Sequence, residues 1–395
     1  MLVQRGYKTE LDPNNKQKTL LAKNAGAARY AYNWALGIKQ ECMKVKSKIP
    51  NAIELHRRLN ELKRSELPWM YEVSKCSPQE ALRNCDTAFK NFFDRCKKKV
   101  KGKKGFPKFK SKKNGLGSFR LTGSIRVFEN HVQLPRIGKV RLKESGYIPT
   151  DAKILSATVS EKAGRWFVSI QVEEQVIPTY KPEKTTVGID LGVKTLATCS
   201  NGQTFDNPKA LRSDLKKLQR LSRRTSRKVK GSQNRKKAAT RLARLHYKIA
   251  CIRKDMIHKI TTFLTKTKSK VVIEDLNVSG MLKNRRLSRA IADVGLFEFR
   301  RQLEYKGKWH GCEIAVADRF YPSSKMCSAC GNIKHDLQLS DREYRCENCG
   351  HVIDRDLNAS VNLENYSTVS SPGINAFGEG SSGSMCSRVK LPSLN

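Results

Sequence analysis

The sequence has few acidic residues. Its 36 Asp and Glu stand against 78 Lys and Arg, so the 395-residue chain carries a formal net charge of +42 at pH 7. Such an imbalance makes a compact fold repel itself unless a polyanion neutralises the charge. Nucleic acid is the partner we expect, since phosphate contacts and counterion release would supply the affinity. A basic surface that serves solubility alone does not explain an excess of this size.

The sequence also lacks long apolar runs. No stretch of about 18 apolar residues is present that could cross a bilayer, and a polybasic contact with a membrane surface has little support. Residues Met1 to Glu10 show no positively charged region followed by an apolar one, so we expect no secretory signal. We therefore expect no membrane association. The length of the chain suits two or three domains.

Cysteine is not scarce, and its 12 residues are of two kinds. Four form the pairs Cys327-Ser328-Ala329-Cys330 and Cys346-Glu347-Asn348-Cys349, each followed by a glycine. This spacing predicts a four-cysteine zinc site, which is structural because no ligand position is left for water. Disulfides or a redox pair are the less favoured alternative. The others are scattered singly and fit free thiols in a reducing cytoplasm: Cys42, Cys76, Cys85, Cys96, Cys199, Cys251, Cys312 and Cys386.

The first part of the chain predicts a small helical domain. Apolar residues at helical spacing run from Gln17 to Val45, after a start at Asp12-Pro13, and again from Ala52 to Lys63. Ser77-Pro78-Gln79-Glu80 has the pattern of a capping box, which predicts a third helix as far as Cys96. The aromatic stripe of this helix fits a core better than a binding surface: Phe89, Phe92 and Phe93.

Short alternating runs between Ser118 and Val176 predict a small β-barrel or sandwich. Turn residues such as Glu129-Asn130 and Ala163-Gly164 separate these runs. The N-terminal run Val3–Glu10 reads as a strand that needs a distant partner. It could complete the same sheet, which would make the helical domain an insertion. A linker, Ile177–Pro182, ends the region.

Two segments concentrate the positive charge. Lys97–Lys113 is a lysine-rich loop, and its interleaved Phe106 and Phe109 favour a nucleic-acid contact over a solvated linker. Ala210–Thr267 is a basic helical stretch, and the turn Arg223–Ser232 divides it into two long helices. Like charges on one helix face repel unless phosphates lie against them. The residues we expect at phosphates are Lys108, Lys110, Arg223, Arg224 and Arg227.

The few acids include some that packing does not explain. Asp190 interrupts the apolar strand Val187–Leu191, between Gly188 and Gly192, which leave room for another backbone, a phosphate or an ion. The run Lys270–Leu276 ends a second strand in Glu274-Asp275, and Asp354-Arg355-Asp356 opens the last helix. The alternation of strands and helices in this half predicts a mixed α/β sheet. Three acids would then converge at one sheet edge.

Three adjacent carboxylates repel one another unless a divalent metal holds them. Hard oxygen ligands suit Mg²⁺ or Mn²⁺ rather than Zn²⁺. Two such ions would activate water and stabilise the leaving oxygen in phosphodiester hydrolysis. Ordinary strand-end acids are the weaker alternative once three are placed on one such scaffold.

These motifs resemble the transposon-encoded TnpB (OrfB) family. In chain order they are Gly105–Lys110, Ser118–Arg120, Gly188–Gly192, Ile273–Leu276, Ser324–Gly331, Tyr344–Gly350 and Asp354–Ala359. The likeness covers nearly the whole chain to about Tyr366. Residues 367–395 are rich in Ser and Gly, and we expect a disordered tail there.

The resemblance implies a multidomain α+β and α/β fold. A wedge β-barrel would comprise residues 1–10 and 114–180, with a helical recognition domain inserted at 11–113. An RNase H-like RuvC nuclease domain would comprise residues 181–325 and 353–366, with a zinc ribbon inserted at 326–352.

The resemblance also implies an RNA-guided DNA endonuclease related to type V CRISPR effectors. A guide RNA from the transposon end (the ωRNA, or omega RNA) would pair with double-stranded target DNA beside a short adjacent motif. The motifs place the catalytic and Mg²⁺ ligands at Asp190, Glu274 and Asp356, with Asp354 as the alternative to Asp356. The residues implied at the adjacent motif are Lys75, Gln79 and Thr122. Such a protein would be prokaryotic and cytoplasmic, and associated with the nucleoid when bound to DNA.

Two other functions stay open on the residues alone. One is a DNA-binding regulator of transposition that does not cleave, and Mg²⁺-dependent cutting of a matched plasmid separates it from a nuclease. The other is a stand-alone transposase, which would act on transposon ends without RNA and resist RNase treatment.

Overall fold

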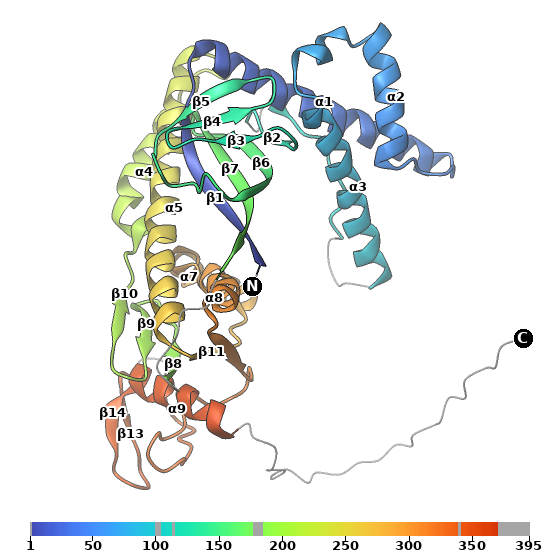
Figure 1. Ribbon diagram of the computed structural model, residues 1–395. Coiled ribbons are helices and arrows are strands. Elements are labelled where there is room, and N and C mark those ends of the chain that lie inside the picture. The colour runs from blue at the N-terminus through green and yellow to red at the C-terminus, as the bar shows by residue number, and fades with distance from the viewer. Residues whose placement is uncertain (1, 99–103, 113–114, 177–184, 339–340, 370–395) are drawn as a thin grey trace, which may run out of the picture. The chain divides into compact units, whose positions relative to one another are not determined.

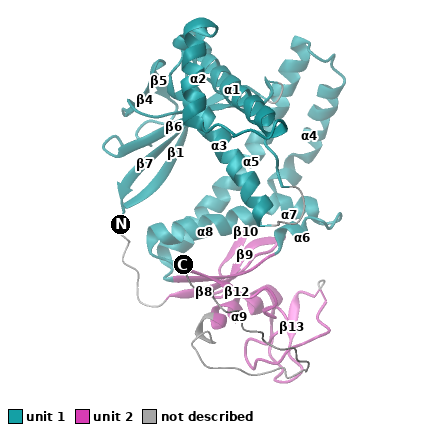
Figure 2. Ribbon diagram, turned by 90° about the vertical axis from the view of Figure 1, so that its right-hand side faces the viewer, with its two compact units in different colours: residues 1–183, 207–269, 277–313 teal, residues 184–206, 270–276, 314–395 magenta. Residues whose placement is uncertain are grey.

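The computed structural model describes residues 2–98, 104–112, 115–176, 185–338 and 341–369 (Figure 1). The chain divides into two compact units (Figure 2). Unit 1 holds residues 1–183, 207–269 and 277–313, and unit 2 holds residues 184–206, 270–276 and 314–395. Among the described residues, no helix is long and apolar enough to cross a membrane. The predicted linker Ile177–Pro182 lies outside the described residues.

Unit 1 contains a seven-stranded sheet with the order β2-β6-β7-β1-β5-β4-β3. The predicted alternating runs are confirmed as strands. Their bounds are β1 Leu2–Asp12, β2 Ser118–Leu121, β3 Arg126–Val127, β4 His131–Leu134, β5 Gly138–Leu142, β6 Lys153–Lys162 and β7 Arg165–Gln175. The hairpin between β6 and β7 turns at Ala163 and Gly164, whose φ angles of 56° and 75° suit a tight two-residue turn.

The N-terminal strand lies inside this sheet. β1 pairs antiparallel with β7, from Leu2 opposite Gln175 to Leu11 opposite Trp166, and its end pairs with β5. The prediction that this strand completes the sheet is confirmed, and the helical segment is an insertion between β1 and β2. In the described residues β2 and β3 form the two edges, so the hydrogen-bonded ladder is open and does not show a closed barrel.

The insertion consists of helices α1 (Asn15–Lys44), α2 (Ala52–Ser65) and α3 (Cys76–Lys97), with a 3₁₀ turn at Pro68–Glu72. The predicted helix start at Asp12-Pro13 is wrong. Asp12 ends β1, and Asn14 caps α1 because its side chain accepts the backbone N–H of Gln17 in a capping box.

The predicted capping box at Ser77 is also wrong. α3 already begins at Cys76, and no side chain caps it. The Ser77 hydroxyl instead donates to Oδ1 of Asn24 on α1 at 2.7 Å. Both residues are buried, and buried polar groups need a hydrogen-bond partner. The Ser77 hydroxyl therefore bonds to Asn24 of another helix and does not cap α3.

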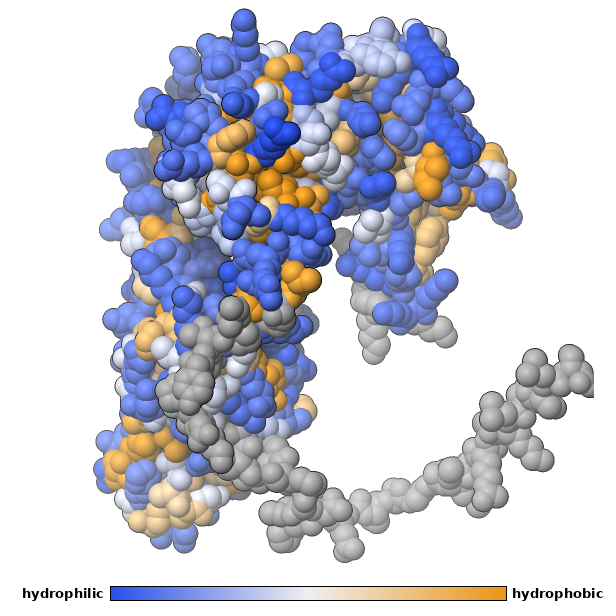
Figure 3. Space-filling view, in the orientation of Figure 1, coloured by the Kyte–Doolittle hydropathy of each residue, from blue (hydrophilic) through white to orange (hydrophobic). Residues whose placement is uncertain are grey.

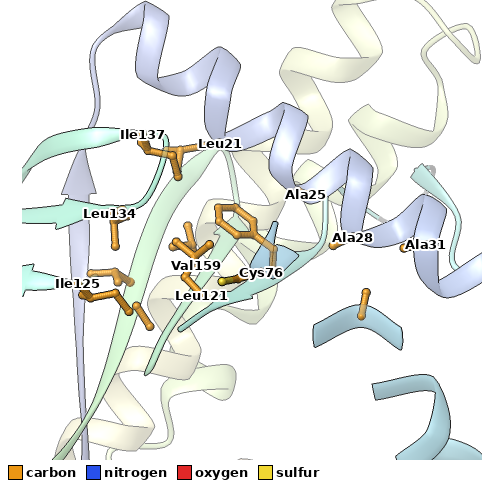
Figure 4. Close-up of a cluster of buried hydrophobic side chains, with 14 of the residues drawn as sticks. Leu21, Ala25, Ala28, Ala31, Cys76, Leu121, Ile125, Leu134, Ile137 and Val159 are labelled. Atoms are coloured by element: carbon orange, nitrogen blue, oxygen red, sulfur yellow. The ribbon is translucent and has the colours of Figure 1, made fainter. Parts of the chain in front are cut away.

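The helices and the sheet of unit 1 share one hydrophobic core (Figure 4). In the close-up, Leu21 of α1 lies near Ile137 of the sheet region, while Leu121 and Val159 come from β2 and β6. The core prediction for α3 is confirmed for Phe89, which is 3% exposed.

Five helices of the second half also belong to unit 1. They are α4 (Ala210–Ser226), α5 (Gln233–Thr267), α6 (Val278–Met281), α7 (Ser288–Val294) and α8 (Leu296–His310). The two long basic helices α4 and α5 are confirmed. The predicted nuclease domain placed them with the second sheet, whereas here α5 packs on β7. Its Tyr247 ring lies 5.3 Å from the ring of Phe167, and Arg244 Nε donates to the carbonyl of Ala163.

Unit 2 contains a mixed five-stranded sheet with the order β10-β9-β8-β11-β12. The predicted α/β sheet is thus confirmed, with β8 antiparallel to β9 and parallel to β11. Its strands are β8 Thr186–Asp190, β9 Thr195–Cys199, β10 Thr204–Asp206, β11 Lys270–Glu274 and β12 Glu313–Ala317.

The last helix, α9 (Arg355–Val369), packs against β8. It follows a two-stranded sheet of β13 (Glu343–Arg345) and β14 (Val352–Asp354). α9 extends beyond the predicted boundary at Tyr366, and residues 370–395 of the predicted tail lie outside the described residues.

Candidate active site, zinc cluster and basic surfaces

Asp190 and Glu274 end two neighbouring strands of unit 2. β8 and β11 run parallel, and Ile189 lies opposite Ile273 in their register. The next residue on each strand is the acid, so both carboxylates lie at the same edge of the sheet. Ile189 and Ile273 are fully buried, which fixes this register.

Gly188 allows α9 to reach this edge. A Cβ at this position would lie 2.0 Å from the carbonyl oxygen of Ser360 and 2.4 Å from the backbone nitrogen of Glu364. Only glycine permits such an approach, and the predicted use of Gly188 for a neighbouring backbone is confirmed. Gly192 serves the turn after β8, where a Cβ would lie 2.8 Å from the carbonyl oxygen of Thr195.

α9 carries the third acid in its first turn. Asp356 lies 3.4 Å from the guanidinium of Arg355, measured from Oδ1 to Nη2. Asp354 has a different role, because its Oδ1 accepts the backbone N–H groups of Asp356 and Leu357, both at 3.0 Å. It thereby satisfies first-turn donors in the manner of a helix cap.

The three acids interact through their charges. The pKa of Asp190 is raised to about 7, first by burial and then by the negative charges of Glu274 and Asp356. Arg355 and the backbone N–H of Leu191 oppose this rise. Asp356 of α9 is thus among the charges that raise the pKa of Asp190, and Asp354 at the end of β14 is not. Carboxylates crowded in this way, with part of their negative charge offset by Arg355, fit a hard divalent cation, whose preferred ligands are oxygen atoms.

Two further polar residues contact the acidic edge, and sequence reasoning missed both. Ser323 Oγ donates a hydrogen bond to Oε1 of Glu274, and Arg319 forms an ion pair with Asp275. They lie in the segment between β12 and the first cysteine pair. The apolar residues of this segment do not recur at helical or strand spacing, so the sequence does not predict the direction of its side chains.

The four cysteines gather as predicted. The sulfurs of Cys327, Cys330, Cys346 and Cys349 all lie within 4.8 Å of one another. Within the described part of the chain, this is the group of three or more His, Cys, Asp or Glu side chains whose ligand atoms gather closely enough for one metal ion. The distances are 3.7 Å from Cys327 to Cys349 and 3.5 Å from Cys330 to Cys346. Tetrahedral zinc with Zn–S bonds of about 2.3 Å separates its sulfurs by roughly 3.8 Å, so the cluster fits one zinc ion.

Each cysteine pair is closed by its glycine. Gly331 and Gly350 have φ angles of 76° and 70°, in the left-handed region that suits glycine. Their N–H groups donate to the carbonyls of Cys327 and Cys346, respectively. The two halves of the cluster therefore have the same local geometry.

Lys75 and Thr122 line one pocket of about 740 Å³ in unit 1. Lys63, Arg64 and Arg136 line the same pocket and add positive charge. Gln79 lies one turn further along α3, half-buried, and is not among the residues of this lining. Two of the three predicted contacts to an adjacent DNA motif thus share a basic pocket.

The described part of the basic loop is anchored to the helices. Phe106 packs edge-on against Phe92 and Phe89, with ring centroids 5.0 and 5.8 Å apart. The ammonium of Lys110 lies 3.9 Å from the centre of the Tyr32 ring, in cation–π contact. Lys108 is exposed. Lys110 is exposed too, but its ammonium already contacts the Tyr32 ring.

The predicted arginines of α4 lie together. Arg223, Arg224 and Arg227 are all exposed and line a pocket of about 680 Å³ with four neighbours, Lys216, Gln219, Arg220 and Lys228. No acid is in that lining. Hydrophilic side chains cover most of the molecular face in Figure 3, as a strongly charged composition requires.

Family models match successive parts of this chain. Residues 169–285 match the OrfB_IS605 model, described as "Probable transposase", and residues 297–363 match the Cas12f1-like TNB domain. Residues 1–47 match a model described as a helix-turn-helix domain. In the structure those residues form β1 and α1, a strand followed by one helix.

Relatives with established names agree with these matches, two of them over most of their length. The chain is 39% identical over 366 residues to a Streptomyces pristinaespiralis protein named "Putative RNA-guided DNA endonuclease", covering 91% of this chain and 89% of that protein. It is 33% identical to "Putative RNA-guided DNA endonuclease InsQ" of Escherichia coli K12, with 91% of both chains covered. A mimivirus "TnpB-like protein L79" is 30% identical over 48% of this chain and 39% of its own length. The chain belongs to the transposon-encoded TnpB (OrfB) family, as the sequence motifs indicated.

The fold also resembles a solved structure. The protein in "Cryo-EM structure of the Cas12f1-sgRNA-target DNA complex" matches with a TM-score of 0.58 and 15% identity, over 93% of this chain and 99% of that one. At this level of identity the match shows a shared fold alone.

Proposed function

We propose that this protein is an RNA-guided, divalent-metal-dependent DNA endonuclease of a transposon. The arrangement of two strand ends and one helix in unit 2 carries the proposal. Asp190 and Glu274 follow paired residues of the parallel strands β8 and β11, and α9, whose first turn holds Asp356, packs against β8. The negative charges of Glu274 and Asp356 also raise the pKa of Asp190. The net charge of +42 supplies the affinity for nucleic acid. Relatives that carry the name of RNA-guided DNA endonucleases support the same function.

In this proposal the two sheets have different tasks. The sheet of unit 2 with α9 is the RNase H-like RuvC nuclease core, and the β13–β14 segment is its zinc ribbon. The sheet of unit 1 is the wedge barrel with the recognition helices α1 to α3 inserted. The mixed parallel and antiparallel order of β10-β9-β8-β11-β12 and the Cas12f1-like fold support this assignment.

The chemistry proposed for the acidic edge is phosphodiester hydrolysis. Asp190, Glu274 and Asp356 would hold the metal, and two Mg²⁺ or Mn²⁺ ions would supply, when bound, an activated water and charge stabilisation at the leaving oxygen. Partial burial of Asp190 strengthens its electrostatic interactions. Arg355 offsets part of the negative charge and remains beside Asp356.

Sequence recognition rests with the guide rather than with protein side chains. The guide RNA pairs with the target strand, and the protein holds phosphates through basic surfaces such as Arg223, Arg224 and Arg227. The short motif beside the target is read at the pocket of Lys75 and Thr122, with Gln79 nearby on α3.

The test is cleavage by the purified ribonucleoprotein. A plasmid that matches the guide and carries the adjacent motif is expected to be cut with Mg²⁺, and not by Asp190→Ala or after RNase treatment before assembly. Binding of the matched plasmid without cutting would replace the enzyme with a regulator. Cutting or strand transfer that survives RNase would replace it with a stand-alone transposase.

A further inference from the structure

A single hydroxyl group supports one of the proposed metal ligands. Ser323 is 3% exposed, and its Oγ donates to Oε1 of Glu274. A hydroxyl that donates to a carboxylate forms a strong, charge-assisted hydrogen bond. A glutamate side chain has several rotatable bonds, and fixing them costs conformational entropy. The Ser323 contact holds one carboxylate oxygen in place and leaves Oε2 of Glu274 outside this bond.

Ser323 is itself held by a buried asparagine of α9. Asn362, only 1% exposed, donates through Nδ2 to the carbonyl oxygens of Ser323 and Met326, at 2.7 and 2.6 Å. The hydroxyl of Tyr321 donates to the carbonyl of Asn362 at 3.0 Å. These bonds fix the backbone of Ser323 against the helix that carries Asp356.

A second asparagine ties the same backbone to the zinc cluster. Asn358 is fully buried, and its Nδ2 donates to the carbonyl of Met326 at 2.7 Å. Its Oδ1 accepts the N–H of Ser328 at 2.9 Å. Met326 and Ser328 flank Cys327, so Asn358 forms hydrogen bonds on both sides of the first cysteine of the cluster. Zinc bound by the cysteines would fix that turn, and the turn would fix the segment from Ser323 to Cys327.

We propose that Ser323 is a positioning residue that orients Glu274 for the divalent metal, and that the zinc-bound turn sets the position of Ser323 through Asn358 and Asn362. The inference deepens the proposed function and rests on Glu274 being a metal ligand. Residues that form hydrogen bonds to a metal ligand commonly contribute about 10- to 100-fold in metal affinity. We therefore expect the loss of the Ser323 hydroxyl to weaken metal binding on the order of tenfold or more.

The main experiment measures metal binding directly. Mn²⁺ alone is titrated by electron paramagnetic resonance into zinc-loaded, full-length protein, and zinc content and thermal midpoint are measured on the same samples. We expect Ser323→Ala to weaken Mn²⁺ binding about tenfold or more at unchanged zinc content. Ser323→Thr keeps a hydroxyl and should restore most of the affinity.

The neighbouring residue supplies the matched control. Ser324→Ala removes a hydroxyl one position away, and its Mn²⁺ affinity should equal that of the wild type. In the ribonucleoprotein, Ser323→Ala should need about tenfold more Mg²⁺ for half-maximal cleavage, with most of the rate recovered at saturation. Asn362→Ala should weaken Mn²⁺ binding too, and the double variant Ser323→Ala/Asn362→Ala should lose little more than the weaker single variant.

Each remaining outcome decides the question. If Glu274→Gln loses Mn²⁺ and Ser323→Ala binds it like Ser324→Ala, the positioning role is wrong while the proposed function stands. If Ser323→Ala loses zinc together with thermal stability and Ser323→Thr does not restore Mn²⁺ binding, Ser323 is structural and the inference fails. If Glu274→Gln changes neither Mn²⁺ binding nor cleavage, the proposed acid site itself falls, and the inference with it.

Discussion

At the scale of single residues, neighbouring acids of the same type have different roles. Asp354 and Asp356 are two positions apart, yet the first accepts backbone N–H groups of α9 and the second contributes charge at Asp190. Motif position alone left both open as the third ligand. The proposed assignment takes Asp356 as the ligand, and the bonds from the N–H groups of Asp356 and Leu357 to Asp354 Oδ1 favour a capping role for Asp354.

The two acids should therefore respond differently to truncation. Asp356→Ala is expected to abolish Mg²⁺-dependent cleavage with little change in thermal midpoint. Asp354→Ala should keep cleavage and lose about 1 kcal/mol of stability through the missing cap. A plasmid-cleavage time course and thermal unfolding of each variant measure both effects. Normal cleavage by Asp356→Ala, with loss in Asp354→Ala, would move the ligand by two residues.

The raised pKa of Asp190 predicts a pH-dependent stability of the Mg²⁺-free protein. The folded protein keeps this proton up to about pH 7, whereas the ordinary pKa of an aspartate in the unfolded chain is 3.8. The folded state thus binds more protons in this range, and the contribution of Asp190 to stability falls as the pH rises from about 4 to 7. Asp190→Asn removes this loss.

We expect Asp190→Asn to melt a few degrees above the wild type at pH 8 without Mg²⁺, and the difference to shrink towards pH 5. Differential scanning fluorimetry across this pH range measures the effect. Added Mg²⁺ should raise the midpoint of the wild type at pH 8 and leave Asp190→Asn nearly unchanged. A difference between the proteins that is the same at pH 5 and pH 8 would contradict the assignment.

At the scale of elements, a glycine determines whether α9 can dock on β8. A methyl group at Gly188 would overlap the backbone of α9, and backbone cannot rotate away as a side chain can. Gly188→Ala is expected to cost at least about 1–3 kcal/mol and to abolish cleavage, because it displaces the helix that carries Asp356. The matched control is Gly37→Ala in α1, where a Cβ meets no atom within 4 Å. That variant should be neutral or slightly stabilising in thermal unfolding.

The folded structure of the β13–β14 segment should depend on the bound zinc ion. Cys330→Ser is expected to lose the single zinc ion, measured by atomic emission, and to expose the β13–β14 segment to proteolysis. Cys42→Ser changes a scattered cysteine and should keep one zinc per chain. Retention of zinc by Cys330→Ser at wild-type affinity would contradict a four-cysteine site.

Local patterns predicted the elements better than their ends or their neighbours. The alternation in Trp166–Val172 and the apolar strand before Asp190 gave β7 and β8, because strand period reflects burial of one face. The helix starts failed at Asp12 and Ser77 because distant partners decided them: β5 pairs with Asp12, and Asn24 accepts the hydrogen bond of Ser77.

The candidate site was predictable where a motif carried it. The four cysteines stand in recognisable spacing, and the three acids stand in family motifs at strand ends and a helix start, so their types pointed to their chemistry. Ser323 and Asn362 could not be found in this way, because their roles exist only through contacts across about 40 positions or more, such as Ser323 to Glu274.

At the scale of the whole molecule, the excess of positive charge should govern guide binding. The dissociation constant for RNA is expected to rise steeply with salt concentration. The triple variant Arg223→Ala/Arg224→Ala/Arg227→Ala should lower the slope of log K against log salt by about 2, at roughly 0.7 per lost single-strand phosphate contact. Filter-binding titrations between 50 and 500 mM NaCl measure the slope. The control Lys16→Ala/Lys18→Ala removes exposed charge from α1, and an equal change per charge would show that the α4 surface is not a preferred contact.

The placement of Asp356 on α9 has a consequence for synthesis of the chain. During translation Asp190 and Glu274 emerge from the ribosome long before α9. A nascent chain halted between Glu274 and Asp356 holds two of the acids without the third. With these three acids as the proposed metal ligands, cutting competence would arise late in translation, after the basic helices and the zinc-binding turns have been made. An interrupted or truncated product can hold nucleic acid through its basic helices and yet leave the host chromosome intact.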